Sequence, residues 1–340
     1  MAPLQCYSDI SKTDLQTPIY YSVFYSSRRD TLIVNCQLLI VNSFRKHQFT
    51  AAKNLPPRKK LTCLFISLTE AGIIRRNSIP GGIFLRVVVK VGTSTLAHPT
   101  GHLNIRRVEE LCRILSDIKN AGHQVILVSS GAIGMGVGKL GLRERPKDIP
   151  TKQAAAAVGQ CELMYIYDKL FSEYHHTVAQ LLITGEDIAN EDRHRNFSNT
   201  IRRLLELGAL PILNENDTVA TQEIVIGDND TLAAIVARSI QADKLILLSD
   251  IDGLYTANPR TDPDARLIPR VTRIDDALMN RAGGNGTAQG TGGMVTKLQA
   301  ARICLECGCD MVIANGDTPA RLYDILEGRP VGTLFTEERL

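Results

Sequence analysis

Hydrophobic residues follow two alternating periods over residues 85–340, which predicts strands and helices in turn. Short β-branched runs bounded by Gly, Asn or Asp are typical of strands buried on both faces. Longer segments carry apolar residues at helical spacing, as Val108, Leu111 and Leu115 do on one face. The predicted strands are residues 85–91, 124–128, 178–183, 210–213, 244–249, 310–314 and 331–335, and the predicted helices are residues 104–120, 151–174, 191–207, 230–240 and one that begins at residue 295.

Alternation of strands and helices predicts an α/β fold. Strands that are separated by helices pair in parallel, and the helices then cover both faces of the sheet. We therefore expect a three-layer αβα sandwich around a mainly parallel open sheet. In sheets of this kind, ligands bind where strands end and helices begin.

Residues 1–84 do not share this pattern. Their Lys/Arg clusters alternate with apolar fragments, residues 32–41 and 61–68, that have no sustained period and are too short to span a bilayer. The first residues lack the regions of a secretory signal, and three Asp residues among the first thirty disfavour a mitochondrial presequence. We predict a poorly ordered extension before one folded domain, residues 85–340. A targeting role is the less favoured alternative, and removal from the mature protein stays open.

Composition narrows the classes of function. The chain carries a net charge of +3, but residues 1–85 hold 11 of the 39 Lys/Arg and only 4 of the 36 Asp/Glu. The remainder is therefore mildly acidic, and with few aromatic residues it offers no basic surface for nucleic acid. Cys304, Cys307 and Cys309 cluster but lack the second ligand pair of a zinc site. Scattered thiols suit a reducing compartment, so we expect a cytoplasmic protein without a membrane partner.

Two clusters of Asp and Asn lie in the middle of the chain, at residues 214–217 and 227–230. They flank a short apolar piece, residues 223–226, so a hairpin-like excursion would bring them together. A site rich in carboxylates and amides can bind an ammonium group, coordinate a hard cation or orient lysines. Asn, Asp and Gly are also common turn residues. The first cluster follows a predicted strand and the second opens a predicted helix, which favours a binding site.

Glycine-rich segments precede helices at two further places. Residues 129–138 follow a strand, but their spacing matches neither the dinucleotide fingerprint nor the P-loop. Residues 283–293 lead into a helix that carries Lys297, where backbone N–H groups, the helix dipole and a point charge would converge on a phosphate. A flexible linker is the alternative for this loop. Lys90 is delivered by the first strand to a tight turn at Gly92.

These motifs, in this order, resemble those of the amino acid kinase family, and among its members the enzymes that phosphorylate glutamate. The resemblance covers about residues 86–338 and rests on the combination, because each motif alone is weak. The segments that carry it are VVKVGTS (88–94), SGAI (130–133), LNEND (213–217, with Leu213 in place of Ile), IGDND (226–230), GLYTANPR (253–260) and GTGGMVTKLQAA (290–301).

The resemblance implies ATP-dependent transfer of a phosphoryl group to the side-chain carboxylate of L-glutamate, the entry step of proline biosynthesis. The enzyme would be a phosphotransferase with a carboxyl group as acceptor. A glutamate side chain, with a pKa of about 4.3, is already an anion at neutral pH and needs no general base. This agrees with the lack of a convincing His-centred arrangement among the seven His residues. Positioning and positive charge would carry the catalysis.

The same resemblance implies roles for individual residues. Lys90 and Lys297 would act on the ATP phosphates, and Asp230 would orient both lysines. Glutamate would be bound by Ser130, Asp217 and Asn229, with Asp217 on its ammonium group. Mg²⁺ would accompany ATP through phosphates and waters, without an assigned protein ligand. The nucleotide contacts would be Lys90, Ser249, Asp250, Thr291, Gly292, Gly293, Met294, Val295, Thr296 and Lys297.

The chain departs from the family pattern in three respects. Ser249-Asp250 stands where bacterial members have Thr-Asp, which keeps the hydroxyl group. We expect no C-terminal PUA domain and no fused reductase domain. Any regulation or assembly that depends on such domains is therefore not implied. We expect a homo-oligomer, a dimer or a tetramer, and functional coupling to glutamyl phosphate reductase. Proline sensitivity stays open.

Three rival functions compete with this interpretation. Other acylphosphate kinases of the family share the glycine loops and the lysines, although the two Asp/Asn clusters favour glutamate. A catalytically inert amino-acid sensor on the same fold would not need both Lys90 and Lys297. A dinucleotide-binding oxidoreductase is disfavoured because no proper fingerprint follows any predicted strand.

Overall fold

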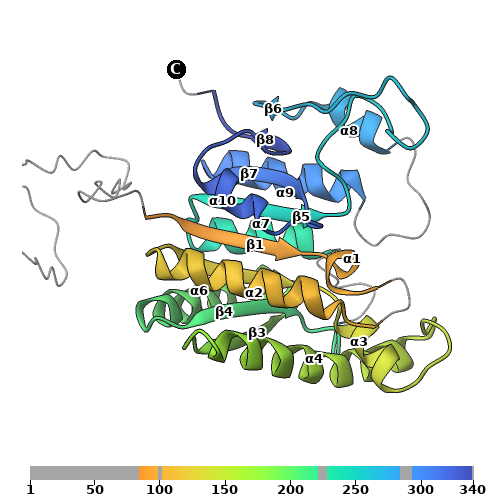
Figure 1. The fold of residues 1–340 in the computed structure, drawn as a ribbon, viewed down its shortest axis with the longest axis vertical. Helices are drawn as coiled ribbons and strands as arrows, with labels where there is room; N and C mark the ends of the chain where they lie inside the picture. The colour runs from red at the N-terminus through yellow and green to blue at the C-terminus, as the bar shows by residue number, and fades with distance from the viewer. Residues whose placement is uncertain (1–83, 99–101, 221–227, 284–292, 339–340) are drawn as a thin grey trace, which may run out of the picture. The chain divides into compact units, whose positions relative to one another are not determined.

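The computed structural model describes residues 84–98, 102–220, 228–283 and 293–338 (Figure 1). All of them belong to one compact unit, residues 76–340, of the two units into which the chain divides. The predicted extension lies outside the described residues apart from Phe84, so its poor order stays a prediction. No helix in the described part is long and apolar enough to cross a membrane.

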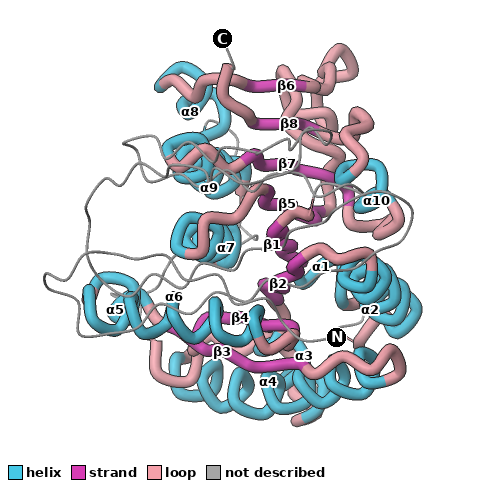
Figure 2. The backbone as a smooth tube through the Cα atoms, turned by 90° about the vertical axis from the view of Figure 1, so that its left-hand side faces the viewer, coloured by secondary structure: helices cyan, strands magenta, loops and turns pink. Residues whose placement is uncertain are grey.

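A sheet of eight strands runs through the middle of this unit (Figure 2). All pairings between neighbours are parallel except that of β7 with β8, which is antiparallel. The mainly parallel open sheet is thus confirmed. Across the sheet the order is β3 (Val178–Ile183), β4 (Leu210–Glu215), β2 (Gln124–Ser129), β1 (Arg86–Val91), β5 (Lys244–Ser249), β7 (Asp310–Asn315), β8 (Thr333–Phe335) and β6 (Arg270–Val271).

Alternate residues of the central strands face opposite layers of helices. Val88 packs into one core, whereas Val87 and Val89 pack into the other. A sheet buried on both faces explains why these strands read as continuous apolar runs. The first core includes α6 (Glu191–Glu206), α7 (Asn229–Ser239) and α9 (Met294–Glu306), and the second includes α2 (Ile105–Asn120), α4 (Ile149–Ser172) and α10 (Arg321–Leu326). The predicted three-layer sandwich is therefore confirmed.

β1 lies at the point where the chain switches sides of the sheet. Lys90 pairs with Val128 of β2 on one side and with Leu247 of β5 on the other. The chain passes from β1 toward β2, β3 and β4, and later crosses to β5 and β7. In open α/β sheets the crevice at such a switch point is the usual ligand site, because the following connections diverge there.

Several short elements were not predicted. They are α1 (Thr93–Leu96), α3 (Ala132–Lys139), α5 (Gly185–Ala189), α8 (Asp276–Gly283), α10 and β6. None has more than eight residues, so few apolar positions repeat along it, and β6 has only two residues. β8 is also shorter than the predicted 331–335, since Gly332 has a φ of +64° that a strand does not accept.

Gly136 of α3 and Gly159 of α4 serve helix packing. A Cβ atom on Gly136 would lie 1.8 Å from the carbonyl oxygen of Ala155, and one on Gly159 would lie 1.7 Å from that of Ala132. The backbones of α3 and α4 therefore touch, which only glycine permits. This contact fixes α3 immediately after the turn at Ser130–Gly131.

We predict that Gly159→Ala lowers the free energy of unfolding by about 3 kcal/mol or more, because the methyl group meets rigid backbone and not a flexible side chain. Urea denaturation of the purified variant measures this. Ala154→Ser, on the exposed side of the same helix, should change the free energy by less than about 0.5 kcal/mol. Equal stability of Gly159→Ala and the native chain would mean that α3 and α4 can separate without cost.

Candidate active site

Functional side chains gather at the carboxyl ends of the central strands. Lys90 is the second-last residue of β1, Ser130 follows β2, and Ser249 ends β5. The amino ends of α7 and α9 supply Asp230 and Lys297 to the same edge. Residues far apart in the sequence thus meet at the switch point of the sheet.

Asp230 is buried between two lysines. The Nζ atom of Lys90 lies 2.6 Å from Oδ1 of Asp230, and that of Lys297 lies 2.9 Å from Oδ2. The side chains are only 11%, 6% and 1% exposed for Lys90, Lys297 and Asp230. Each carboxylate oxygen therefore orients one ammonium group. The three residues lie together as the sequence predicted, although their catalytic role is a separate question.

The charges in this triad determine its chemistry. Burial raises the pKa of Asp230, but the charges of Lys90 and Lys297 and their hydrogen bonds outweigh burial and lower the pKa overall. Asp230 therefore stays ionised at neutral pH. Two cations against one anion leave a net positive charge in a poorly solvated place, where it attracts a phosphate strongly.

Local sequence explains why Asp230 occupies this position. Asp228 caps α7, because its Oδ1 atom accepts hydrogen bonds from the backbone N–H groups of Asp230 at 2.8 Å and Thr231 at 2.9 Å. Asp230 then lies in the first turn, where the helix dipole favours a negative charge. Thr296 on α9 donates to Gly293 O at 2.7 Å and lies 3.4 Å from Asp230 Oδ2.

The two Asp/Asn clusters meet beside the triad. The side-chain amide of Asn229 donates to Ser130 Oγ at 2.8 Å and to Asn214 Oδ1 at 3.0 Å. Asn214 in turn donates to Gln160 Oε1 on α4 at 2.9 Å. The prediction that the clusters come together is confirmed. The hairpin-like excursion itself lies outside the described residues.

Asp217 is half-buried in the turn that follows β4. Within the described ranges, its carboxylate has no hydrogen bond or ion pair. Burial raises the pKa of Asp217, and the charge of Arg145 opposes part of that rise. A partly desolvated carboxylate without a partner is suited to binding a cationic ligand group.

The proposed nucleotide contacts lie at the end of β5 and the start of α9. Ser249 Oγ donates to Asp250 Oδ1 at 3.1 Å, and Asp250 Oδ2 lies 3.3 Å from Nη2 of Arg260. Gly293 precedes α9 in open space, where an added Cβ would meet nothing within 4 Å. Met294, Val295 and Thr296 form the first turn of α9, whereas Thr291 and Gly292 lie outside the described residues.

Sequence reasoning missed Gln160, Asp228 and Arg260 as supports of this site. Gln160 lies in the middle of a long helix, and no spacing marks it. Asp228 and Arg260 lie inside segments that carry the family resemblance, so their positions could have marked them as site residues. Their roles, a helix cap for Asp228 and an ion pair with Asp250 for Arg260, depend on the fold.

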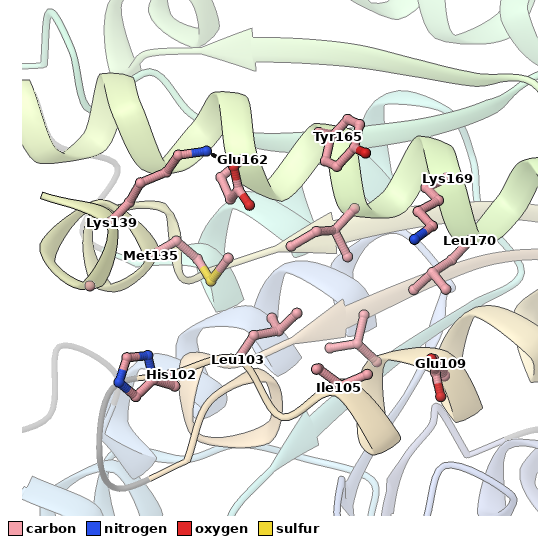
Figure 3. A pocket seen from close by; sticks show the side chains of 13 residues that line it. His102, Leu103, Ile105, Glu109, Met135, Lys139, Glu162, Tyr165, Lys169 and Leu170 are labelled. Atoms are coloured by element: carbon pink, nitrogen blue, oxygen red, sulfur yellow. Dashed lines mark hydrogen bonds and ion pairs between the residues drawn. The ribbon is translucent and has the colours of Figure 1, made fainter.

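A separate groove of about 590 Å³ lies between α2, α3 and α4 (Figure 3). Its lining is largely apolar and includes Leu103, Ile105 and Met135, with the ion pair of Lys139 and Glu162 at one side. None of the predicted site residues lines it. The groove is therefore distinct from the candidate active site.

Residues 85–315 match the model of the amino acid kinase family. The chain belongs to the amino acid kinase family. Among its relatives, a glutamate 5-kinase of Clostridium perfringens is 52% identical over 75% of this chain and 96% of its own length. A glutamate 5-kinase of Symbiobacterium thermophilum is 55% identical over 74% of this chain and 96% of its own length.

Solved structures confirm the fold of this family member. A carbamate kinase from Giardia lamblia bound to AMP-PNP superposes with a TM-score of 0.56 at 16% identity, covering 75% of this chain and 99% of its own. An isopentenyl phosphate kinase from T. acidophilum gives a TM-score of 0.52 at 17% identity, covering 74% and 99%. At 16–17% sequence identity, these similarities establish the fold and nothing about function.

We predict that Asp230→Asn lowers the free energy of unfolding at pH 7 by about 3–5 kcal/mol, because two buried ammonium groups lose their counter-charge. A folded-state pKa below the unfolded value of about 3.9 means that Asp230 stabilises the fold above that pH and loses this effect as pH falls through its folded pKa. Chemical denaturation from pH 7 downward should therefore show less acid sensitivity in the variant. The exposed Asp168→Asn is the control, and equal losses in both variants would contradict the prediction.

Proposed function

We propose that this family member phosphorylates the γ-carboxylate of L-glutamate with ATP, giving L-glutamyl 5-phosphate at the start of proline biosynthesis. The observation that carries the proposal is the buried Asp230, which holds Lys90 and Lys297 at the switch point of the sheet. Relatives that are more than 50% identical and named glutamate 5-kinase support this substrate and not another acylphosphate acceptor.

The reaction joins two anions, and the lysines reduce their repulsion. An oxygen of the γ-carboxylate attacks the γ-phosphorus atom of ATP, the bond from that phosphorus to the β–γ bridging oxygen breaks, and ADP leaves with the electron pair. Lys90 and Lys297 stabilise the charge on the transferring group and on the leaving phosphate. Asp230 is not a general base, because its lowered pKa leaves it no tendency to accept a proton.

Glutamate is held by the polar groups beside the triad. Asp217 binds the ammonium group with a carboxylate that has no partner among the described residues. Ser130 accepts a hydrogen bond from Asn229, so the proton of its own hydroxyl group remains available to a substrate oxygen. Asn229, fixed by Asn214, completes the contact with the substrate.

Mg²⁺ would enter this site with the nucleotide. The described residues contain no group of three or more His, Cys, Asp or Glu side chains that could hold a metal ion. A donor set of ATP phosphates and waters fits Mg²⁺, which keeps several waters in most phosphate sites. When bound, the ion neutralises phosphate charge, and the protein contributes the two lysines and the start of α9.

We extend the proposal to the setting of the enzyme. The five described cysteines are free thiols, which supports a reducing compartment such as the cytoplasm. An acyl phosphate is a reactive product, so functional coupling to a glutamyl phosphate reductase would limit its loss to water. We also expect a homo-oligomer, and sedimentation would distinguish a dimer from a tetramer.

The test of the proposed function is ATP turnover by the full chain with Mg²⁺ and with glutamate, aspartate or N-acetylglutamate. Hydroxylamine in the assay traps an acyl phosphate as its hydroxamate. We expect hydroxamate with glutamate alone. Hydroxamate with another substrate would assign the chain to a different acylphosphate kinase. Folded protein that binds glutamate without forming hydroxamate would favour an amino-acid sensor.

We predict that Lys297→Met lowers kcat by about 100-fold or more while the KM for glutamate changes little, because the lost charge acts chiefly in the transition state. Steady-state kinetics of the variant measure both constants, and thermal unfolding checks that it is folded. An unchanged kcat would remove Lys297 from the catalytic residues.

Asp217→Asn should instead raise the KM for glutamate by about tenfold or more, with kcat and the KM for ATP nearly unchanged. In the native enzyme this KM should rise as pH falls, because protonation removes the charge that binds the ammonium group. Since the pKa of Asp217 is raised, the rise begins above the range of an ordinary Asp. Kinetics at several pH values should show no such rise in the variant, and an effect on ATP alone would refute this assignment.

A further inference from the structure

α4 reaches the substrate side of the site through a buried amide side chain. The helix lies along the end of the sheet that holds β3 and β4 (Figures 1 and 2). Gln160, in the middle of α4, is only 7% exposed, and its Oε1 atom accepts a hydrogen bond from Asn214 Nδ2 of β4 at 2.9 Å. The proposed function gives Gln160 no role. Because a buried amide is costly unless it is hydrogen-bonded, the effect of this contact on its neighbours is informative.

The partners of Asn214 fix which way its amide group points. Its Oδ1 atom accepts from the backbone N–H group of Glu215 at 2.9 Å, and its Nδ2 atom donates to Gln160. The same Oδ1 atom accepts from Asn229 Nδ2 at 3.0 Å. Asn214 is only 3% exposed. Without the oxygen of Gln160, its NH₂ group would be buried without an acceptor, which favours rotation of the side chain away from Asn229.

Asn229 turns its own NH₂ group toward the protein. Its Nδ2 atom lies 3.0 Å from Asn214 Oδ1, 2.8 Å from Ser130 Oγ and 3.3 Å from the backbone oxygen of Ser129. A backbone oxygen only accepts hydrogen bonds, so the amide cannot be reversed while these partners stay in place. The Oδ1 atom of Asn229 has no hydrogen-bond partner among the described residues, and it is not buried. Asn229 therefore offers a ligand an acceptor and not a donor.

This acceptor matches one charged group of glutamate. The ammonium group donates hydrogen bonds, whereas both carboxylates accept them. An ammonium group has three N–H donors, so it can use an amide oxygen in addition to the carboxylate of Asp217. A reversed Asn229 would instead direct its NH₂ group at the ammonium group and weaken binding.

We propose that Gln160 is a positioning residue that orients Asn229 toward the substrate ammonium group by holding Asn214 in place. This inference rests on the proposed function, because glutamate supplies the ammonium group. The three amides form a chain in which Asn229 donates to Asn214 and Asn214 donates to Gln160. Each hydrogen bond in such a buried chain supports the next. Gln160 thus acts on substrate affinity only through the two asparagines.

The experiment replaces Gln160 by Met, which has a similar length but only a weak acceptor, in the hydroxamate assay with the full chain. In Gln160→Met we expect the KM for glutamate to rise about tenfold, with kcat and the KM for ATP nearly unchanged. Glutarate, which lacks the ammonium group, serves as a competitive inhibitor against glutamate, and its Ki should not change. Gln160→Glu keeps an oxygen that accepts from Asn214, so its KM for glutamate should stay within about threefold of the native value.

Gln124→Met is the matched control. Gln124 Oε1 also accepts a side-chain hydrogen bond at 2.9 Å, from Arg86 Nε, but Gln124 begins β2 whereas the site lies where β2 ends. This variant should keep the native KM for glutamate. Thermal unfolding checks that each variant is folded. If Gln160→Met is not, Gln160→Asn replaces it with the same expected KM, because its amide is one CH₂ group too short to reach Asn214.

Three results would overturn the positioning role. The first is an unchanged KM for glutamate in a folded Gln160→Met. The second is an equal rise in the KM for glutamate and the Ki of glutarate, which would indicate general loosening of the pocket. The third is the same change in Gln124→Met.

Failure of the proposed function would be seen separately. If the native chain forms no hydroxamate from glutamate, titration calorimetry with glutamate and glutarate replaces kinetics. Weaker binding of glutamate alone in Gln160→Met would support the role of Gln160 in a binding protein, and unchanged binding of glutamate would overturn it. A native chain that neither phosphorylates nor binds glutamate would overturn both proposals.

Discussion

The buried carboxylate of Asp230 is the interaction on which the site depends. Without it, two ammonium groups from opposite parts of the chain would repel each other in a poorly solvated place. With it, both are held within hydrogen-bond distance of a single residue and keep a net positive charge. Under the proposed function, the two ammonium groups are in place before phosphate binds, so little reorganisation remains for the reaction.

The remainder of the fold positions the elements that carry Lys90, Asp230 and Lys297. Because β1 and β5 pair in parallel, their carboxyl ends lie at the same edge of the sheet. The helix cap at Asp228 makes α7 begin there, so that Asp230 lies in its first turn. Backbone contact between α3 and α4 at Gly136 and Gly159 fixes α3 directly after the turn that carries Ser130. Most of the packing is ordinary apolar burial. The few contacts that tolerate only one residue type lie next to the candidate active site.

The sequence predicts most of the long elements, because buried strands and amphipathic helices have a clear period. It does not predict α1 or β6, which are too short to repeat a period, or α3, whose glycines are typical of a loop. Lys90, Asp230 and Lys297 were found through their motifs, and their meeting follows from the parallel sheet. The support from Gln160 and the influence of Arg145 on Asp217 could not be predicted, because both depend on how α4 packs beside β4.

The separation of Lys90 and Lys297 in the sequence has a consequence for synthesis on the ribosome. The site needs a strand that emerges among the first of the domain and a helix that emerges about 200 residues later. Closing so long a loop is entropically costly and is repaid only when α9 docks beside α7. Under the proposed function, a nascent or truncated chain that ends before α9 lacks one of the two lysines and does not transfer phosphate, so activity would report that translation and folding of the domain are complete.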